Sequence, residues 1–253
     1  MTDESPGAVM ITGGSRGIGL GTARVMGRDG WKVTITGTTE DRLAAAKHDL
    51  AADGIDCHTV YFAVEDEAAW SGAVADTEAA FGPLSALVLN AGISPKRDGS
   101  KIPFGDDDGD AWQQTMDVNL MGVVYGMRAV LPGFKERGGS IVAISSIVGR
   151  VAVPLGSTYY AASKAAVIGL VQSAAFELGG FGIRVNAVLP GRIATDMVAA
   201  AGEELNNSLI PVIALGRLGE PEEVGEAINF LCGPRASYIT GICLDATGGW
   251  HSN

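Results

Sequence analysis

The sequence is poor in the residue types that build disulfide frameworks and metal centres. Its 253 residues include only three cysteines and three histidines, with no C-x-x-C pair and no ligand spacing. We therefore expect no disulfide framework and no metal site, and reduced thiols suit a cytoplasmic protein. No apolar run is long enough to cross a bilayer, and the polar, acidic start of the chain does not resemble a signal peptide.

Positive charge is scarce as well. Lys and Arg number 18 against 29 Asp and Glu, which gives a formal net charge of −11. This balance repels nucleic acid and anionic membranes, so neither is an expected partner. The acidic run 106–110 resembles the start of a calcium loop, but Ala111 and Asp117 stand where that loop needs glycine and glutamate. We expect no calcium there.

What the sequence does contain is a regular alternation of short apolar runs and longer amphipathic segments. The predicted strands are 8–12, 32–36, 57–62, 85–89, 140–144, 183–189 and 241–244, and the predicted helices are 17–28, 41–52, 67–81, 111–131, 158–178 and a region around 222–231. This alternation predicts an α/β fold with a doubly wound parallel sheet (a Rossmann fold) and helices on both faces. No linker divides the chain, so we expect one domain, 1–253.

A glycine-rich run follows the first predicted strand directly. The residues are TGGSRGIG at 12–19, and a predicted helix comes next. Gly13, Gly17 and Gly19 permit a tight turn, close backbone approach to phosphate oxygens and close packing of the helix. The N-terminus of that helix offers N–H groups to a pyrophosphate. This context favours a dinucleotide-binding turn over a purely structural one.

Tyr160 and Lys164 stand four residues apart in the predicted helix 158–178 and therefore share a face. A cation near a phenol favours the phenolate, which lowers the pKa of tyrosine from about 10 toward neutral pH and suits an acid–base catalyst. Taken alone, such a pair more often belongs to an ordinary helix surface. Tyr159 is a rival phenol, but it lacks a lysine four residues later.

Several motifs together resemble the short-chain dehydrogenases/reductases in order and spacing. They are the glycine run 12–19, Asn90-Ala91-Gly92, Asn119, Ser146, Tyr160 with Lys164, and Pro190-Gly191. The resemblance spans roughly residues 8–249 and implies an NAD(P)-binding domain that transfers hydride between a nicotinamide and a carbonyl or alcohol. It also implies a homotetramer, which apolar surface on the helices predicted at 111–131 and 158–178 would suit.

The same resemblance implies roles for the catalytic residues. Tyr160 would be the acid–base, and Lys164 would lower its pKa and bind the nicotinamide ribose. Ser146 would hold the substrate oxygen and stabilise developing charge. Asn119 would anchor a water-linked proton relay through Lys164, with a helix-interior residue satisfied by the backbone as the structural alternative.

One interval departs from the family pattern. Ser146 and Tyr160 are one residue further apart than is common in the family, so we expect the loop 149–157 to bulge. Ser145 remains an alternative to Ser146.

The resemblance also implies a set of cofactor contacts. They are Gly13, Ser15, Arg16, Gly17, Ile18, Gly19, Thr38, Thr39, Val64, Asn90, Gly92, Tyr160, Lys164, Pro190, Gly191, Ile193 and Thr195, with Thr195 holding the nicotinamide carboxamide. The aspartate common before the Val64 position, against the adenine, is replaced here by Ala63, which puts one adenine contact in doubt.

The cofactor is predicted from the end of the second strand. Gly37 stands where an NAD-specific site usually has an acid for the ribose 2′-hydroxyl. Arg16 and the hydroxyls of Thr38 and Thr39 favour a 2′-phosphate, although the arginine frequent at position 38 is missing. We expect NADP(H), with NAD(H) as the alternative.

The substrate is predicted from what is missing. In 3-oxoacyl-carrier-protein reductases, which the chain also resembles, arginines that dock the acidic carrier align with Pro132 and Phe176 of this sequence. Uncharged residues there, and a charge of −11, would repel such a carrier. We expect an NADPH-dependent carbonyl reductase (a secondary alcohol dehydrogenase) acting on a small free ketone. The alternatives are a 3-oxoacyl-thioester reductase and a non-catalytic nucleotide-binding relative.

A flexible-looking, Ala-rich segment occupies the place where relatives keep a lid over the substrate. It covers about 196–213, and a closing lid would exclude water from hydride transfer. Met197 and Val198 either line the pocket or pack within the lid.

Overall fold

Seven parallel strands form one sheet in the computed structural model, which describes residues 6–97, 100–107, 109–153, 156–199 and 202–250. The strands are β1 (Ala8–Ile11), β2 (Lys32–Gly37), β3 (Cys57–Tyr61), β4 (Leu84–Leu89), β7 (Gly139–Ile144), β8 (Ile183–Pro190) and β9 (Cys243–Ala246). Their order is β3-β2-β1-β4-β7-β8-β9. The order reverses between β1 and β4, and sheets of this kind bind ligands at that point, beyond the carboxyl ends of the strands.

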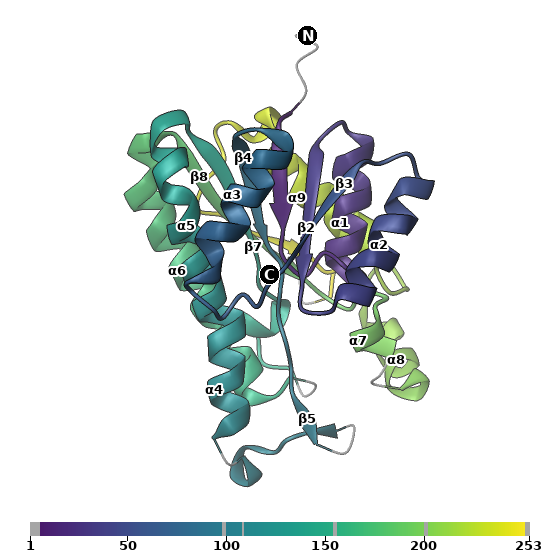
Figure 1. Cartoon of the computed structure of the whole chain (residues 1–253). Helices are drawn as coiled ribbons and strands as arrows, with labels where there is room; N and C mark the ends of the chain where they lie inside the picture. The colour runs from purple at the N-terminus through teal and green to yellow at the C-terminus, as the bar shows by residue number, and fades with distance from the viewer. Residues whose placement is uncertain (1–5, 98–99, 108, 154–155, 200–201, 251–253) are drawn as a thin grey trace.

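Helices cover both faces of the sheet (Figure 1). One face carries α1 (Gly17–Arg28), α2 (Glu40–Ala52) and α9 (Pro221–Cys232), and the other carries α3 (Ala69–Phe81), α5 (Gly122–Arg137) and α6 (Thr158–Leu178). The predicted doubly wound α/β fold is confirmed. Within the described ranges, no helix is both long and apolar enough to span a membrane.

The two faces follow from alternation along each strand. On β1, Val9 and Ile11 belong to the hydrophobic core under α1 and α9, whereas Met10 belongs to the core under α3, α5 and α6. All three side chains are fully buried. A buried parallel strand must be apolar on both faces, and this is why these segments read as continuous hydrophobic runs.

Three predicted elements differ from those observed. The helix expected over 111–131 is α4 (Asp110–Met116), a π-helical segment (Asp117–Met121) and α5 in succession. A π segment contains one extra residue per turn and is not visible in apolar periodicity. The last strand lies two residues later than expected. The segment between the predicted strand 85–89 and the predicted helix 111–131, for which no element was predicted, contains β5 (Lys96–Arg97) and β6 (Ser100–Lys101), which are too short to show a strand pattern.

Several elements project beyond the carboxyl ends of the strands. They are α4, the β5–β6 hairpin, α7 (Asp196–Ala199) and α8 (Glu203–Leu209), all at the lower end of the molecule in Figure 1. The segment predicted as a lid therefore contains two short helices and the 3-10 turn Ile210–Val212, with residues 200–201 outside the described part of the chain. These elements and the strand ends enclose the site.

Candidate active site

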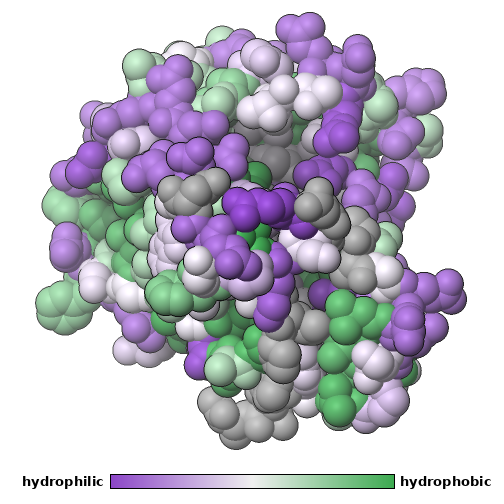
Figure 2. Space-filling view, turned by 90° about the horizontal axis from the view of Figure 1, so that it is seen from below, coloured by the Kyte–Doolittle hydropathy of each residue, from purple (hydrophilic) through white to green (hydrophobic). Residues whose placement is uncertain are grey.

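A cavity of about 700 Å³ opens at the carboxyl ends of the strands. Figure 2 looks onto this end of the molecule, where hydrophilic and hydrophobic residues surround a hollow near the centre. Residues from the glycine loop line the cavity together with Tyr160, Lys164 and Ser146. Segments far apart in the sequence thus meet at the position that the strand order predicts.

Tyr160 and Lys164 lie on the first two turns of α6. Lys164 is 3% exposed, and its Nζ donates a hydrogen bond to the carbonyl of Ile144 at 2.8 Å. The same Nζ lies 5.7 Å from the centre of the Tyr160 ring. Burial lowers the pKa of Lys164 to about 8, because a charged ammonium loses its hydration there.

The pKa of Tyr160 differs in direction from the sequence-based expectation. Burial raises the pKa of this half-buried phenol, and a hydrogen bond with Ser146 opposes the rise without cancelling it. Lys164 does not lower it as expected, since its ammonium is directed at the Ile144 carbonyl. In this structure Tyr160 is therefore a neutral phenol at physiological pH.

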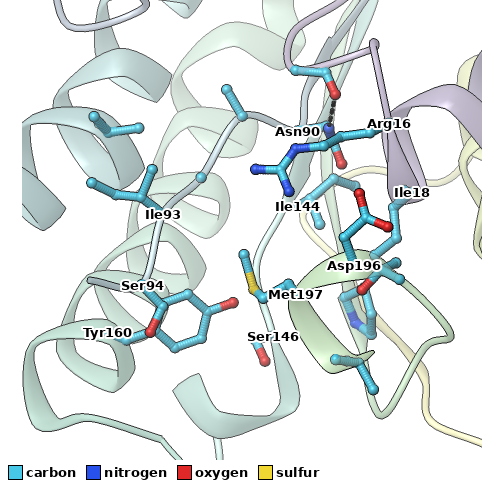
Figure 3. Close-up of a pocket in the computed structure, with 18 of the residues that line it drawn as sticks. Arg16, Ile18, Asn90, Ile93, Ser94, Ile144, Ser146, Tyr160, Asp196 and Met197 are labelled. Carbon is cyan, nitrogen blue, oxygen red and sulfur yellow. Dashed lines mark hydrogen bonds between the residues drawn. The ribbon is translucent and has the colours of Figure 1, made fainter. Parts of the chain in front are cut away.

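Ser146 and Ser145 have different surroundings. Ser146 follows β7 with its side chain in the cavity, where Figure 3 shows its hydroxyl directed toward the same space as that of Tyr160. It accepts a weak hydrogen bond from the N–H of Val148 at 3.4 Å. Ser145 is 2% exposed and donates to the carbonyl of Lys164 at 2.7 Å. The geometry favours Ser146 for contact with a substrate.

The two neighbouring tyrosines, Tyr159 and Tyr160, also have different surroundings. The side chain of Tyr159 is fully buried, its hydroxyl donates to the carbonyl of Pro95, and its ring packs edge-on against Trp112. Tyr160 lines the cavity. Tyr159 therefore has a packing role, and Tyr160 is the phenol available to a ligand.

Asn119 lies in the π-helical segment and braces the wall of the cavity. Its Oδ1 accepts from the N–H of Ile93 at 2.8 Å, and its Nδ2 donates to the Ile93 carbonyl at 2.9 Å and to the Ser163 hydroxyl at 3.0 Å. The side chain is 1% exposed and does not line the cavity. The Asn119 amide thus behaves as a buried polar group whose hydrogen bonds are satisfied largely by the backbone. Any part that Asn119 plays in a proton relay is indirect.

The glycine loop between β1 and α1 fits a dinucleotide. Gly13 and Gly17 have φ of 62° and 53°, a region that favours glycine. A Cβ on Gly19 would lie 2.3 Å from the carbonyl oxygen of Gly13, so this glycine permits packing beneath the loop and does not line the cavity. No side chain caps the N-terminus of α1, which leaves its N–H groups for an anion.

Asn90 holds the loop in place. Its Nδ2 donates to the carbonyls of Thr12 and Gly13 at 2.9 and 3.1 Å, the latter bond lying within the part of the site drawn in Figure 3. The Thr12 hydroxyl in turn accepts from the N–H groups of Asn90 and Ala91. The end of β4 is therefore fastened to the end of β1, and the conformation of the phosphate loop is fixed without a ligand.

The other residues predicted to contact the cofactor lie around the same cavity. It is lined by Ser15, Arg16, Ile18, Thr38, Thr39, Val64, Gly92, Pro190, Gly191, Ile193 and Thr195. The carbonyl of Val64 accepts from the indole of Trp70 at 2.9 Å, so its N–H and side chain are the groups best placed to contact an adenine. Thr195 lies against the glycine loop, because a Cβ on Gly17 would be 3.2 Å from its methyl group.

Sequence reasoning missed several lining residues. Arg42 belongs to the first turn of α2 and follows Thr38 and Thr39 closely in the sequence. This closeness could have identified Arg42 as a candidate for the same site. Lys96, Ser100 and Lys101 on the hairpin, and Trp250 near the end of the chain, also line the cavity. Their positions depend on how long loops return to the site, which no local pattern shows.

The predicted lid residues Met197 and Val198 line the cavity. Figure 3 shows Met197 near the Tyr160 hydroxyl and Asp196 beside Ile18. Behind them, the guanidinium of Arg192 donates twice to Oδ1 of Asn206, at 3.0 and 2.6 Å. Nδ2 of Asn206 donates to the Val198 carbonyl at 3.0 Å, which joins α8 to α7. In the part of the chain that the structure describes, no cluster of residues suits a metal ion.

Comparison with known proteins identifies the family. The family model described as enoyl-(acyl carrier protein) reductase matches residues 13–251. A 3-oxoacyl-[acyl-carrier-protein] reductase of Staphylococcus aureus is 34% identical over 246 residues, 96% of this chain and 98% of the relative. An acetoacetyl-CoA reductase of Synechocystis sp. is 37% identical over 248 residues, 96% of each chain.

A solved structure agrees with these relatives. It is a 3-oxoacyl-[acyl-carrier protein] reductase with bound NAD from Brucella melitensis, with a TM-score of 0.90, 34% identity and coverage of 97% of this chain and 91% of the other. The present chain belongs to the short-chain dehydrogenase/reductase family. It is an NAD(P)-dependent oxidoreductase, as the sequence predicted.

Proposed function

We propose that this protein reduces 3-oxoacyl thioesters to 3-hydroxyacyl thioesters with NADPH. The observation that carries the proposal is the meeting of Tyr160, Ser146 and Lys164 with the glycine loop in one cavity. The Staphylococcus and Synechocystis relatives are both named for a 3-oxoacyl thioester substrate, which supports the same reacting group here. The small free ketone expected from the sequence has no support among these relatives, and the thioester alternative is the better proposal.

In this proposal the catalytic residues handle the carbonyl oxygen. A bound NADPH would supply the hydride to the carbon at position 3 of the acyl chain. Tyr160 donates its proton to the oxygen, and Ser146 donates a hydrogen bond to the same atom. A raised pKa keeps the Tyr160 phenol protonated and ready to act as the acid. The Lys164 ammonium then stabilises the phenolate that remains.

We assign Asn119 a positioning role in the relay that restores the proton to Tyr160. It fixes the Ile93 backbone and the Ser163 hydroxyl. A Cβ on Gly92 would lie 3.3 Å from both Oδ1 of Asn119 and Nζ of Lys164. Gly92 thus allows these two side chains to approach the same strand end.

NADP(H) is the proposed cofactor. Arg16 from the glycine loop and Arg42 from α2 both line the cavity next to Thr38 and Thr39, a set suited to a 2′-phosphate. Gly37 at the end of β2 carries no acid that would repel it. The NAD bound to the Brucella protein makes NAD(H) the competing cofactor.

The proposed carrier of the acyl group is coenzyme A. Pro132 on α5 is exposed, and Phe176 on α6 is 92% exposed. Neither position offers a cation to an acidic carrier protein, and the net charge of −11 adds a general repulsion. Coenzyme A needs no protein docking surface.

A direct assay distinguishes the substrates. NADPH oxidation would be followed with acetoacetyl-coenzyme A, the acetoacetyl thioester of an acyl carrier protein, and simple ketones such as cyclohexanone. We expect kcat/KM for acetoacetyl-coenzyme A to exceed that for the simple ketone by about a hundredfold, because only the thioester fills the extended cavity. Equal or faster reduction of the simple ketone would overturn the proposed substrate class.

We further propose that the protein is a cytoplasmic homotetramer. The supporting observation is a set of apolar side chains on α5 and α6 that are only partly buried, Tyr125, Leu131, Ile168 and Leu170, together with Phe176, which is 92% exposed. Several incompletely buried apolar side chains on one pair of helices are typical of an interface. Light scattering of the purified protein tests it, and a monomer at micromolar concentration would contradict it.

A further inference from the structure

The β5–β6 hairpin presents two lysines to the cavity. Lys96 and Lys101 are paired directly across the two antiparallel strands, and both line the cavity. Directly opposed residues lie on the same face of such a pair. The two ammonium groups therefore share the face of the hairpin that borders the site.

Hydrogen bonds hold the first strand of the hairpin and the segment that leads into it. At its base the hydroxyl of Tyr159 donates to the carbonyl of Pro95, and Asn119 bonds both backbone groups of Ile93. At its far side Arg97 donates to the carbonyl of Asp106 at 2.9 Å. Figure 3 shows that Ile93 and Ser94, which lead into the hairpin, lie next to Tyr160. The segment that leads into the hairpin thus lies beside the catalytic phenol, and the hairpin with its two lysines lies further out, at the lower end of the molecule in Figure 1.

Cations are concentrated at this cavity although the chain is acidic. Among its described lining residues, six are basic and two are acidic: Arg16, Arg42, Lys96, Lys101, Lys164 and Arg192 against Glu65 and Asp196. Arg16 and Arg42 lie at the end proposed for the adenosine 2′-phosphate, and Lys164 is buried beside Tyr160. The hairpin lysines form a second positive region, on the substrate side.

We propose that Lys96 and Lys101 bind the phosphate groups of coenzyme A when a 3-oxoacyl-coenzyme A occupies the cavity. This inference rests on the proposed function and deepens it. In such a substrate a long, uncharged pantetheine arm separates the reacting carbonyl from the phosphates. With the carbonyl at Tyr160, the arm runs outward to the rim, where ammonium groups pair with phosphate oxygens as point charges.

The test compares two substrates with the same reacting group. Acetoacetyl-coenzyme A carries the phosphates, whereas acetoacetyl-pantetheine lacks them. For the double variant Lys96→Gln/Lys101→Gln we expect kcat/KM with acetoacetyl-coenzyme A to fall about tenfold through KM, with kcat unchanged. Kinetics with acetoacetyl-pantetheine should stay unchanged. An equal loss with both substrates, or no loss with acetoacetyl-coenzyme A, would overturn the proposal.

A matched control removes the same charge elsewhere. Lys47 on α2 and Lys135 on α5 do not line the cavity, and Lys135 lies over the ring of Phe181. The variant Lys47→Gln/Lys135→Gln should leave both substrates unaffected. A comparable loss in this control would mean that net charge, not the hairpin, attracts the substrate. Unchanged thermal midpoint and NADPH affinity in both double variants verify the fold.

Binding of coenzyme A itself separates this inference from the proposed function. Calorimetry on the NADPH complex should show coenzyme A binding that the hairpin variant weakens about tenfold. If this holds while no thioester is reduced, the phosphate subsite stands and the proposed function fails. If acetoacetyl-coenzyme A is reduced without dependence on the lysines, the function stands and the subsite fails. A lysine-dependent loss confined to the acetoacetyl carrier protein would overturn coenzyme A as the occupant.

Discussion

At the proposed cofactor end of the cavity the walls are mainly backbone and small residues, whereas the proposed substrate end is walled by side chains from the hairpin, α6 and α7. Asn90 fastens the glycine loop through backbone carbonyls, and Gly19 leaves no room for a side chain beneath it. At the other end, Lys96, Met197 and Tyr160 contribute their own functional groups.

The difference separates two kinds of specificity. A pyrophosphate is bound by N–H groups and a helix terminus, which many sequences provide once the glycines are in place. A substrate is recognised by particular side chains, which change without disturbing the sheet. Cofactor binding should therefore respond to changes in backbone shape, and catalysis and substrate affinity to changes in single functional groups.

The largest expected effect is at Tyr160. Tyr160→Phe removes the proton donor and keeps the ring, so kcat should fall about a thousandfold while NADPH affinity changes little. Tyr159→Phe is the matched control; it loses the bond to Pro95 and should keep most of the activity. Steady-state kinetics and fluorescence titration with NADPH measure both quantities. Near wild-type turnover in Tyr160→Phe would remove the basis of the catalytic assignment.

The second effect tests the cofactor end through its backbone. A Cβ in Gly19→Ala would lie 2.3 Å from the Gly13 carbonyl oxygen and 2.6 Å from Nδ2 of Asn90, so the loop must shift. We expect a loss of about 2 kcal/mol in stability and a tenfold or greater loss in NADPH affinity, since overpacking displaces the phosphate loop. The control Gly72→Ala, on the surface of α3 with open space around it, should be neutral or stabilise by up to about 1 kcal/mol. Unchanged NADPH binding in Gly19→Ala would contradict the packing account.

The third effect concerns the proposed 2′-phosphate site, the part of the cofactor end where side chains would bind the ligand. Arg42→Gln should raise KM for NADPH about fivefold and leave KM for NADH within about twofold, because only NADPH carries the 2′-phosphate. Lys47→Gln, on the same helix but away from the cavity, is the control. Equal changes for both cofactors would place Arg42 outside the 2′-phosphate site.

A substitution at Gly37 tests the same cofactor preference by adding a negative charge where Arg42→Gln removes a positive one. A Cβ there would meet Leu43 and Ser15 at ordinary distances of 3.5 Å, so Gly37→Asp should fold normally. The added carboxylate should shift the preference toward NADH, and an unchanged NADPH/NADH ratio would count against the proposed cofactor.

A fourth, smaller effect tests the substrate end. Asn206→Ala removes the acceptor of Arg192 and the bond to the Val198 carbonyl, which loosens α7 and α8. KM for acetoacetyl-coenzyme A should rise about fivefold with NADPH affinity unchanged. Asn207→Ala, at the exposed neighbouring position, should have no effect. An equal loss of NADPH affinity would show that the two ends are not independent.

The smallest effect is a pH dependence of stability. The pKa of Lys164 is about 8 in the folded protein and 10.5 without burial, so above pH 8 the unfolded state binds more protons and stability rises with pH. The free energy of unfolding of the wild type, minus that of Lys164→Met, should increase by about 1 kcal/mol between pH 7 and 9. The subtraction is needed because raised pKa values of the Cys57 and Cys232 thiols act in the opposite direction above pH 9. If this difference in the free energy of unfolding does not change with pH, the lowered pKa of the buried Lys164 is wrong.

The sequence predicted the parts of the molecule that depend on local patterns. Apolar runs located the strands, and the glycine loop and the pair Tyr160 and Lys164 were found by their spacing. The raised pKa of Tyr160 was missed, because burial and the direction of the Lys164 ammonium depend on tertiary packing. The β5–β6 hairpin was missed because two-residue strands have no periodicity.

The sequence left open which of two adjacent serines and which of two adjacent tyrosines belongs to the site. The hydrogen-bond partners in the structure favour one residue of each pair. Ser145 and Tyr159 each donate their hydroxyl to a backbone carbonyl. Ser145 also borders the cavity, but Ser146 and Tyr160 are the serine and tyrosine without such a bond that line it. The expected bulge in the loop 149–157 falls partly on residues 154–155, outside the described chain.

The end of β7 is joined to α6 at a single residue. Lys164 receives a hydrogen bond from Ser145 on its carbonyl and gives one to Ile144 from its ammonium, and a Cβ on Gly149 would lie 2.7 Å from its backbone carbon. These contacts fix the relative position of strand and helix, and apart from Gly149 at its start they do not use the loop between them. The length of that loop is then free to drift during evolution, and an insertion there can reshape the entrance while the reacting groups keep their geometry.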